Sequence, residues 1–576
     1  MTVPAVFPAG TATVARTLTM LDREFSSFAE AVAKGRYTFW IGSGISRSRV
    51  DSLEQVLHRA LTFLQSRIDP SDADSPHRIA LHKAIGLAQL SPDDLAGVDT
   101  SMPPSTWPAL KLILQVLVNK YSQVLDIRVT GEPEDYMLWE AVDVVATFAG
   151  AGLSAGCEHL CLAILAVEGV LPSMVTANWD GLIEAAVAEL AGDTDLPLQV
   201  CVSPEDFSAS PQRARLLKFH GCAIRARDDE NQYRKYLIGS QWRITSWPHD
   251  SDHAVMSHEM ASLAAVRSTL FLGLSGQDSD IQDTFAKAVR LSPRSWPSSP
   301  PAFVFAEDEL GPMQLNILRV GYGESYGPDA SNIDSSALIR VYASPLLVSL
   351  VLHVLTNKLV EYAKLATPAS FLGIDADNLA RGLRELRDLI STDAENDRDA
   401  FVRRLVAEMI RTMTLFQEGQ APAGLISYRP LSVTPVHQIA QDPGFRLNGL
   451  SQLAVALAVI GLGHAEGAWV ISDQSGTDIE RSAIRARASA GEARIYFVAD
   501  ANAAMRLMIG TAVDASDPDV LIVHSKPLPS TLPRAPRSPV GRTGNARMRE
   551  VDMSELLASS IDLADLRAQF RAAAVM

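Results

Sequence analysis

Short apolar segments that alternate with helical segments are the feature that most limits what this 576-residue chain can fold into. In chain order they read YTFWI (37–41), SMVTAN (173–178), LLKFHG (216–221), STLFLGLSG (268–276), PAFVFAED (301–308) and LIRVYA (338–343). Helical patterns stand between them, such as the one that starts near Leu53 and the segment DGLIEAAVAELAG (180–192). Strands that alternate with helices predict parallel βαβ units. We therefore expect an α/β fold with a doubly wound, Rossmann-like parallel sheet and helical insertions.

The length predicts more than one domain. An apolar helix that follows the last of these strands leads to an expected boundary near Thr367, so residues 1–366 form one domain and residues 367–576 a second. The second is expected to be helical at first and then a smaller α/β unit, with strands at AWVISD (468–473), ARIYFVAD (493–500) and VLIVHS (520–525). We expect it to be regulatory or to bind a partner.

A basic, proline-rich segment spans residues 525–549 and carries arginines in an otherwise acidic chain: Arg534, Arg537, Arg542, Arg547 and Arg549. Its composition is typical of a solvated linker or loop. The alternative is that this segment is part of a regulatory module that binds a partner or signal. Both interpretations stay open at the level of the sequence.

Composition limits the location and the partners of the protein. Apolar residues make up 47% of the chain and charged residues 20%, which is typical of a globular protein. The net charge of −16 disfavours sequence-independent attraction to nucleic acid or to an anionic membrane. Four cysteines are too few for a disulfide framework, the N-terminus lacks the pattern of a signal peptide, and the apolar run at 453–463 is too short to span a bilayer. We expect a cytoplasmic protein with no membrane contact and no direct binding to nucleic acid.

Two stretches at expected strand ends could bind a phosphate-bearing ligand. Residues Gly42–Ser46 read GSGIS and lie between a strand and a helix, where glycines allow close approach of the backbone and helical N–H groups bind anions. Alone this is a weak signal, because short Gly-Ser turns occur in many loops. Gly273 and Ser275 leave a second strand end open in the same way. The nearby Asp278 and Asp280 are expected to cap the helix that begins near Ile281.

Two further stretches carry polar side chains at strand ends. Asn178 and Asp180 flank Trp179, and they point either into a ligand cleft or into an Asx turn that caps the next helix. His220, in KFHG, can exchange protons near neutral pH, although a single histidine beside a strand is more often structural. For Trp179 both lining of a pocket and simple packing remain open.

Taken in order, these four stretches resemble the signatures of the sirtuin family, which are GAGxS, TxNxD, HG and a late GxS strand. The variants TANWDGLIE (176–184) and GLSGQDSDI (273–281) are most similar to the sirtuin-like domains of bacterial antiviral (antiphage) defence proteins. The resemblance covers roughly residues 20–345 and extends to no part of the chain beyond Thr367.

The resemblance implies that NAD binds across the carboxyl ends of the strands. Gly42, Ser43, Gly44 and Ser46 would hold the pyrophosphate, and Gly273 with Ser275 the adenosine side. Asp180 would accept from the nicotinamide carboxamide. The catalytic residues would be Asn178, which positions the ribose or a water, and His220, which takes a proton.

Two departures from the family narrow the activity. Sirtuin deacylases carry a CxxC…CxxC zinc module after the HG motif, whereas Cys222 is the one cysteine that follows it here. The CEHLC cluster at 157–161 falls on an apolar helix, so buried small residues are favoured over a zinc site, and we expect no zinc. The arginine that follows GAGxS in the family has no clear counterpart, and Arg47 or Arg49 could replace it.

These features predict an NAD+ hydrolase that releases nicotinamide and ADP-ribose, with NAD as its substrate. Constant activity would deplete cellular NAD, so we expect a gated effector of antiphage defence, with the C-terminal region as the gate or partner dock. A partner protein encoded nearby is expected, of ATPase, nucleotide-processing or Argonaute-like type, together with homo-oligomeric or hetero-complex assembly. The alternatives are an NAD-dependent protein deacylase and a catalytically silent nucleotide-binding scaffold subunit.

Overall fold

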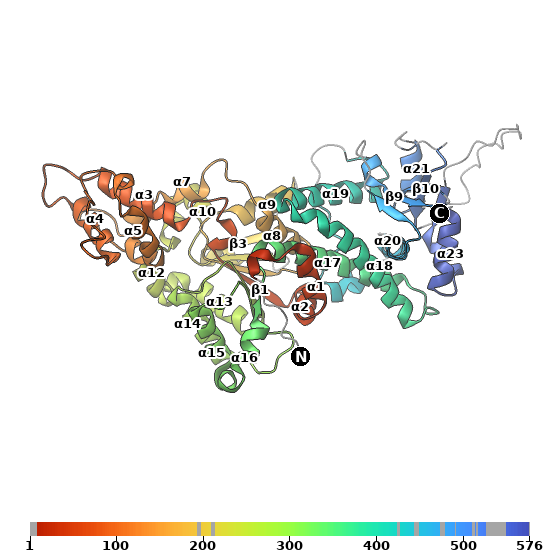
Figure 1. The fold of residues 1–576 in the computed structure, drawn as a ribbon, viewed down its shortest axis with the longest axis horizontal. Coiled ribbons are helices and arrows are strands. Elements are labelled where there is room, and N and C mark those ends of the chain that lie inside the picture. Colours follow the sequence, from red (N-terminus) through yellow and green to blue (C-terminus); the bar gives the residue numbers. More distant parts are fainter. Residues whose placement is uncertain are drawn as a thin grey trace, which may run out of the picture.

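The computed structural model describes residues 8–192, 197–208, 214–422, 427–442, 449–472, 479–489, 491–509, 513, 517–525 and 549–574. Three parts follow one another along its long axis (Figure 1). A helical module lies at one end, a seven-stranded sheet in the middle, and a five-stranded sheet with its helices at the other end. The site predicted from the sequence belongs to the middle part.

The middle sheet is parallel throughout, with the strand order β3-β4-β2-β1-β5-β6-β7. Its strands are β1 (Tyr37–Ile41), β2 (Ser173–Thr176), β3 (Leu198–Cys201), β4 (Ala214–Lys218), β5 (Ser268–Leu272), β6 (Phe303–Ala306) and β7 (Leu338–Ile339). In the central strand, Phe39 stands opposite Met174 of β2 on one side and Leu270 of β5 on the other. The predicted doubly wound α/β fold is confirmed.

Both faces of this sheet are buried, which explains why its strands are almost continuously apolar. Phe39 and Leu270 point to the face that is covered by α8 (Cys157–Val167) and α17 (Ala343–Ala366). The next residues, Trp40 and Phe271, point to the opposite face, which is covered by α13 (Ala254–Val266) and α14 (Ser279–Leu291). The other helices around the sheet are α1 (Val14–Asp22), α2 (Ser26–Ala33), α9 (Leu182–Ala191), α10 (Ala223–Asp228), α11 (Glu230–Tyr233), α12 (Gln241–Ser246), α15 (Pro312–Tyr322) and α16 (Tyr326–Ala337).

A helical module is inserted between β1 and β2, and its hydrophobic core also includes Trp179 and buried residues between 202 and 237. It consists of α3 (Leu53–Ser66), α4 (Pro76–Leu87), α5 (Leu110–Leu117), α6 (Tyr121–Leu125) and α7 (Val144–Ala149). Its first helix begins at the expected residue because Ser52 and Gln55 form a capping box there.

The second sheet has the order β12-β11-β10-β9-β8 and is parallel across β10, β11 and β12 but antiparallel across β8, β9 and β10. Its strands are β8 (Val470–Ser472), β9 (Ile484–Ala488), β10 (Gly491–Phe497), β11 (Val520–His524) and β12 (Arg549–Asp552), and its helices are α18 (Gly373–Ser391), α19 (Arg398–Glu418), α20 (Leu450–Ala465), α21 (Ala501–Ile509), α22 (Met553–Ser559) and α23 (Leu563–Ala574). The predicted smaller α/β unit is confirmed.

The basic segment lies largely outside the described residues, including Arg534, Arg537, Arg542 and Arg547. Arg549 opens β12, where its guanidinium donates to the carbonyl oxygens of Ala574 and Glu492. Arg549 thus has a structural role in this sheet.

Helix α17 joins the two parts of the chain. Among the described helices it is the one long and apolar enough to cross a membrane. However, 78% of its apolar 18-residue stretch is buried inside the structure. It packs against α8 on one side and against α18 and α20 on the other, so one hydrophobic core continues across residues 366 and 367. The boundary near Thr367 stays a prediction.

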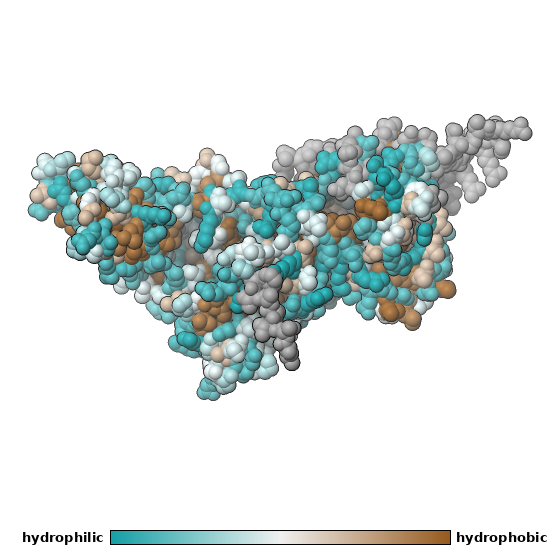
Figure 2. Space-filling model, viewed as in Figure 1, coloured by the Kyte–Doolittle hydropathy of each residue, from teal (hydrophilic) through white to brown (hydrophobic). Residues whose placement is uncertain are grey.

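On the face drawn in Figure 2, hydrophilic residues predominate over the described surface and hydrophobic ones gather in separate patches.

A buried ion pair attaches α17 to its neighbours. The ammonium group of Lys358 donates to the carboxylate and the backbone carbonyl of Glu168, at 2.6 Å in each case, and also to the carbonyl of Ser432. The other carboxylate oxygen of Glu168 accepts from the hydroxyl of Tyr428 at 2.7 Å. Both charged side chains are fully buried, so each depends on the other for its stabilisation.

We expect Lys358→Met to lower the free energy of unfolding by about 3–5 kcal/mol, because it leaves the carboxylate of Glu168 buried without a counter-charge. The control is Lys364→Met on the same helix, where a half-exposed lysine pairs with Glu361 and a change of at most about 0.5 kcal/mol is expected. Chemical denaturation measures both. Equal effects of the two substitutions would show that the buried pair does not stabilise the junction.

Candidate active site

The four polar stretches follow four neighbouring strands. Strands β4, β2, β1 and β5 are adjacent in the sheet and parallel, so their carboxyl ends lie along one edge. This edge is where doubly wound sheets bind ligands. Stretches that are up to about 230 residues apart in sequence therefore meet at one place, as the interpretation of the four as a set requires.

The glycines after β1 and β5 bring two loops into direct contact. The N–H of Gly42 donates to the carbonyl of Leu272 at 2.9 Å, and the N–H of Gly44 donates to the carbonyl of Gly273 at 3.1 Å. A Cβ atom at position 42 would lie 2.3 Å from the carbonyl oxygen of Gly273, whose own φ is +59°. These glycines are thus required by the contact between the loops, before any ligand is considered. Ser43 and Ser275, the serines of these two loops, are exposed at the rim.

The side chain of Asn178 is oriented by the loop after β1. Its Nδ2 atom donates to the carbonyl of Gly42 at 3.3 Å and lies 3.5 Å from the hydroxyl of Ser46. Since a carbonyl can only accept, the amide nitrogen must face it. No hydrogen bond from the described part of the chain reaches Oδ1, so this atom is left as an acceptor for a ligand or a water.

His159 forms a hydrogen bond with the hydroxyl of Ser46, a role that the sequence did not indicate. Its Nδ1 atom accepts from the N–H of Gly156 at 3.1 Å, so Nε2 carries the proton and donates to the Ser46 hydroxyl at 3.1 Å. Burial, with Arg49 close by, lowers the pKa of His159 to about 4, which keeps the ring neutral at pH 7. Cys157 and Cys161 are free and buried, as expected for this cluster.

Trp179 anchors the loop after β2. Its indole N–H donates to the carbonyl of His220 at 3.0 Å and to that of Ile238 at 3.2 Å, and its ring packs edge-on against Phe148. Of the two interpretations left open for this residue, packing is the one observed. The loop thereby holds the backbone of His220 in place.

Asp180 caps the helix that follows. Its Oδ1 atom accepts from the N–H of Leu182 at 3.1 Å. The buried ammonium group of Lys218 donates to the carbonyl of Asp180 and, at 2.8 Å, to the carboxylate of Glu184. Within the described residues no hydrogen bond reaches Oδ2 of Asp180, so capping leaves one oxygen for the carboxamide contact that the resemblance implies.

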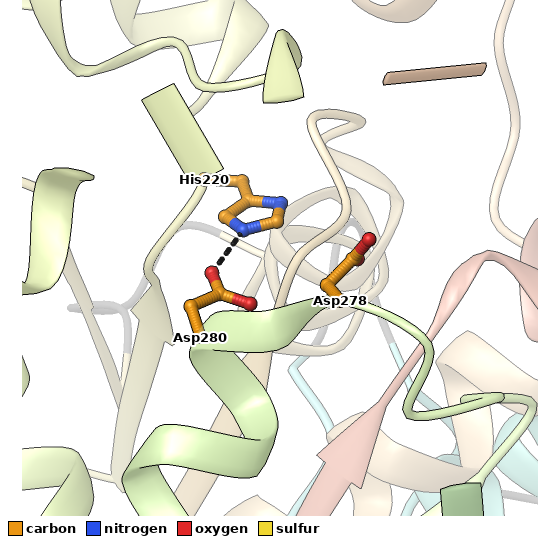
Figure 3. A group of neighbouring side chains, drawn as sticks. All are labelled: His220, Asp278 and Asp280. Carbon is orange, nitrogen blue, oxygen red and sulfur yellow. Dashed lines mark hydrogen bonds and ion pairs between the residues drawn. The ribbon is translucent and has the colours of Figure 1, made fainter. Parts of the chain in front are cut away.

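His220 forms a buried pair with Asp280 (Figure 3). Nε2 of His220 lies 2.7 Å from Oδ2 of Asp280, which also accepts from the indole N–H of Trp247 at 2.6 Å. Burial alone would lower the pKa of His220, but the carboxylate of Asp280, helped by Asp278, outweighs it and raises this pKa. His220 and Asp280 are 2% and 0% exposed.

The structure corrects the expectation that Asp278 and Asp280 cap the next helix. Helix α14 begins at Ser279, and Asp278 at its N-cap position makes no capping hydrogen bond with its side chain. Asp280 accepts from the N–H of the following residue, Ile281, at 2.8 Å, but its other oxygen binds His220. The pairing depends on the packing of α14 against the end of β4, which the sequence alone does not show.

Asp278 links the site to the helical module. The hydroxyl of Tyr121, at the start of α6, donates to Oδ1 of Asp278 at 3.0 Å. Burial raises the pKa of Asp278 and Asp280 adds to this effect, while His220 opposes it. Tyr121 packs against the cores of both the module and the sheet. The module therefore contacts the site through Tyr121.

One ligand atom each from His220, Asp278 and Asp280 lie within 4.8 Å of one another, close enough to hold a cation. The carboxylates are already bound by groups that can only donate or are oriented to donate, namely Trp247, the Ile281 N–H and Tyr121. These donors occupy both oxygens of Asp280 and Oδ1 of Asp278. The cluster fits a hydrogen-bonded relay better than a metal site.

Arg49 reaches the C-terminal region instead of the strand ends. Its guanidinium pairs with Asp399 in the first turn of α19, and the same carboxylate accepts from the N–H of Cys157. Cys157 is the first residue of α8, the helix that carries His159. Arg47 is exposed. Asp399, like Tyr121 and Trp247, lies outside the motifs and carried no signal in the sequence. His159 belongs to the CEHLC cluster, whose pattern indicated only buried residues.

We expect Gly42→Ala to lower the free energy of unfolding by about 1–3 kcal/mol, because the added Cβ collides with the backbone of Gly273. Gly86→Ala is the control, since it lies within α4 with nothing in contact range of an added Cβ and should stabilise by about 0.5–1 kcal/mol. Chemical denaturation of both variants checks the signs. A neutral Gly42→Ala would mean that the two loops are not held in this contact.

Comparison with known families agrees with this geometry. The family model of the SIR2-like domain matches residues 172–325, a range that includes β2, β4 and β5 with Asn178 and His220. The loop after β1 precedes the matched range and joins it through the sheet. No curated protein matches the chain. Residues 172–325 thus match a SIR2-like domain, and domains of this kind bind NAD.

Proposed function

We propose that this protein is an NAD+ hydrolase whose activity is gated. The observation that carries the proposal is the buried His220–Asp280 pair at the carboxyl edge of the sheet, one strand away from Asn178 and within the SIR2-like match. A histidine with a perturbed pKa, an amide with a free acceptor and a glycine-lined strand edge are the parts that NAD cleavage requires.

The reaction breaks the bond between the nicotinamide nitrogen and C1′ of the ribose. Its electron pair leaves with nicotinamide, positive charge develops on the ribose, and water adds at C1′ to give ADP-ribose and a proton. Asn178 would orient the ribose or the water through Oδ1, and His220 would take the proton. Asp180 would accept from the carboxamide of the leaving group, and the loops at 42–46 and 273–275 would hold the pyrophosphate and the adenosine.

The cysteines of this sequence favour hydrolysis over deacylation. A deacylase binds its acyl-lysine in a groove beside a zinc module, and after the HG motif this sequence has one cysteine, Cys222. That thiol is buried 3.8 Å from the carboxylate of Glu184, behind the strand ends. Water is then the molecule available to accept the ADP-ribosyl group.

Gating is supported by two contacts that reach the site from other parts of the chain. Tyr121 of the helical module binds Asp278, and Asp399 of the C-terminal region binds Arg49 and the start of α8. Through α8, Asp399 is connected to His159, Ser46 and Asn178 in turn. A signal or partner bound to the C-terminal region could change the site along this path.

For the cellular role we propose a cytoplasmic effector that depletes NAD in antiphage defence, acting in an oligomer or with a partner protein. The support is the likeness of residues 176–184 and 273–281 to the sirtuin-like domains of such proteins. NAD levels after phage infection of cells with and without the gene would test this role.

We expect His220→Ala and Asn178→Ala each to reduce nicotinamide release by at least about a hundredfold, since each removes a group that acts on the reacting atoms. His258→Ala, an exposed histidine on α13, is the control and should keep full activity. The assay follows nicotinamide release from NAD by the full chain with its genomic neighbour present. Near-native turnover by either site variant, with an unchanged melting curve, would refute the role given to that residue.

We expect Asp399→Ala to change basal NAD cleavage, or its response to the partner, by about twofold to thirtyfold, which corresponds to a coupling of about 0.5–2 kcal/mol. Stability should change little, because the side chain is 38% exposed. Asp393→Ala is the matched control, since it removes a nearby half-exposed ion pair to Arg404 that does not touch the SIR2-like part. If NAD cleavage responds to the partner in the same way in both variants, regulation does not pass through Asp399. Point substitutions suit this test better than truncation at Thr367, which would expose the apolar face of α17.

A further inference from the structure

We propose that Asp280 is a positioning residue that holds His220 in one tautomer, with the proton on Nε2 and with Nδ1 as the atom that takes a proton from the attacking water. The assignment of Nδ1 as the base rests on the proposed hydrolysis. The tautomer itself follows from the hydrogen bonds and does not depend on the activity.

The hydrogen bonds of Asp280 decide where the proton lies. Its Oδ1 atom accepts from the backbone N–H of Ile281, and its Oδ2 atom accepts from the indole N–H of Trp247. An indole N–H and a backbone N–H can only donate, so both carboxylate oxygens already act as acceptors. The proton in the 2.7 Å contact between Oδ2 and Nε2 therefore belongs to His220.

The opposite side of the ring has no hydrogen-bond partner among the described residues. Figure 3 shows Nε2 facing Asp280 and the other ring nitrogen, Nδ1, on the side where Asp278 lies. Among the described residues none forms a hydrogen bond to Nδ1. A neutral imidazole with its proton on Nε2 has a lone pair on Nδ1, so this atom can accept a proton.

The surroundings of His220 allow the ring little freedom. The carbonyl oxygen of His220 accepts from Trp179 and from the N–H of Ile238, both at 3.0 Å, and its ring packs edge-on against Phe219. Trp247 fixes Asp280 from the other side. A base that is held in orientation loses little freedom when it reacts.

In the proposed step, a proton passes from water to Nδ1 as the water oxygen bonds to C1′ and the C1′–nitrogen bond breaks. The electron pair of that bond leaves with nicotinamide. His220 becomes an imidazolium, whose positive charge lies beside the carboxylate of Asp280, and it then releases the proton to solvent. Asp280 lowers the energy of this imidazolium without touching the substrate.

The substitution Asp280→Asn disturbs this arrangement in either orientation of its amide. With the amide oxygen towards Trp247, the NH₂ group meets the N–H of Ile281. With the oxygen towards Ile281, the NH₂ group meets the indole N–H and donates to Nε2, which moves the ring proton to Nδ1. Asp283→Asn is the matched control, because Asp283 is exposed on the same helix.

The test is nitrogen NMR of the full-length protein labelled with ¹⁵N-histidine, in which the chemical shifts of the two ring nitrogens report the tautomer. His220→Gln identifies the signal. We expect the Nε2–H form and a pKa above that of free histidine in the wild type and in Asp283→Asn. Asp280→Asn should lower the pKa of His220 and reduce the Nε2–H form. A wild-type His220 in the Nδ1–H form would overturn the proposal, even if the asparagine variant did not fold.

Activity gives the second readout. The pH dependence of kcat/KM should rise through the pKa of His220, and in Asp280→Asn this acidic limb should move to lower pH while the remaining rate falls at least tenfold. A loss of rate with an unmoved limb would leave Asp280 with a purely structural role and overturn the proposal. If the tautomer is as expected but no NAD is cleaved under any condition, the proposed function fails and the assignment of the tautomer stands.

Discussion

The contact between the loop after β1 and the loop after β5 is the constraint on which the rest of the site depends. Gly42, Gly44 and Gly273 lie so close together that their backbones leave no room for a side chain. Because β1 is the central strand, this contact holds the middle of the carboxyl edge. The carbonyl of Gly42 then fixes the amide of Asn178, and the turn that follows places Ser46 between Asn178 and His159.

Buried charges form a second level of organisation. Removing an ionised group from water is costly unless a partner and further hydrogen bonds replace the water. The pair Lys358–Glu168 meets this requirement with backbone carbonyls and a tyrosine hydroxyl. In the pair Lys218–Glu184 the ammonium group also donates to a backbone carbonyl, but one carboxylate oxygen of Glu184 is buried without a hydrogen-bond partner among the described residues. The His220–Asp280 pair meets the requirement with Trp247 and the Ile281 N–H, but within the described part of the chain one ring nitrogen of His220 has no hydrogen-bond partner.

The site also joins three parts of the chain that are far apart in sequence. Strand ends supply Asn178 and His220, the helical module supplies Tyr121, and the C-terminal region supplies Asp399. Tyr121 contacts the site directly, whereas Asp399 is connected to it through the start of α8 and His159. Helix α17 and its shared core make the C-terminal region a fixed neighbour of the sheet. This arrangement offers a physical route for regulation of the proposed NAD cleavage.

The sequence by itself determined the class of fold and the residues at the strand ends. Buried parallel strands need continuous apolar runs, and their ends need glycine or polar residues, so β1, β2, β4, β5 and β6 could all be predicted, as could Asn178 and His220 as candidates. It did not indicate β3, β9 or β12, because edge strands and antiparallel strands carry polar residues such as Gln199, Arg485 and Glu550 and lack an apolar run.

Tertiary structure alone decided which side chains meet. Asp280 followed the pattern of a helix cap, and it became the partner of His220 because α14 packs with its first turn against the end of β4. His159, Tyr121 and Asp399 stand on helices whose sequence pattern reflects local burial and has no information about a contact more than a hundred residues away. Periodicity records which face of an element is buried, whereas the partners on that face are set by how the elements pack.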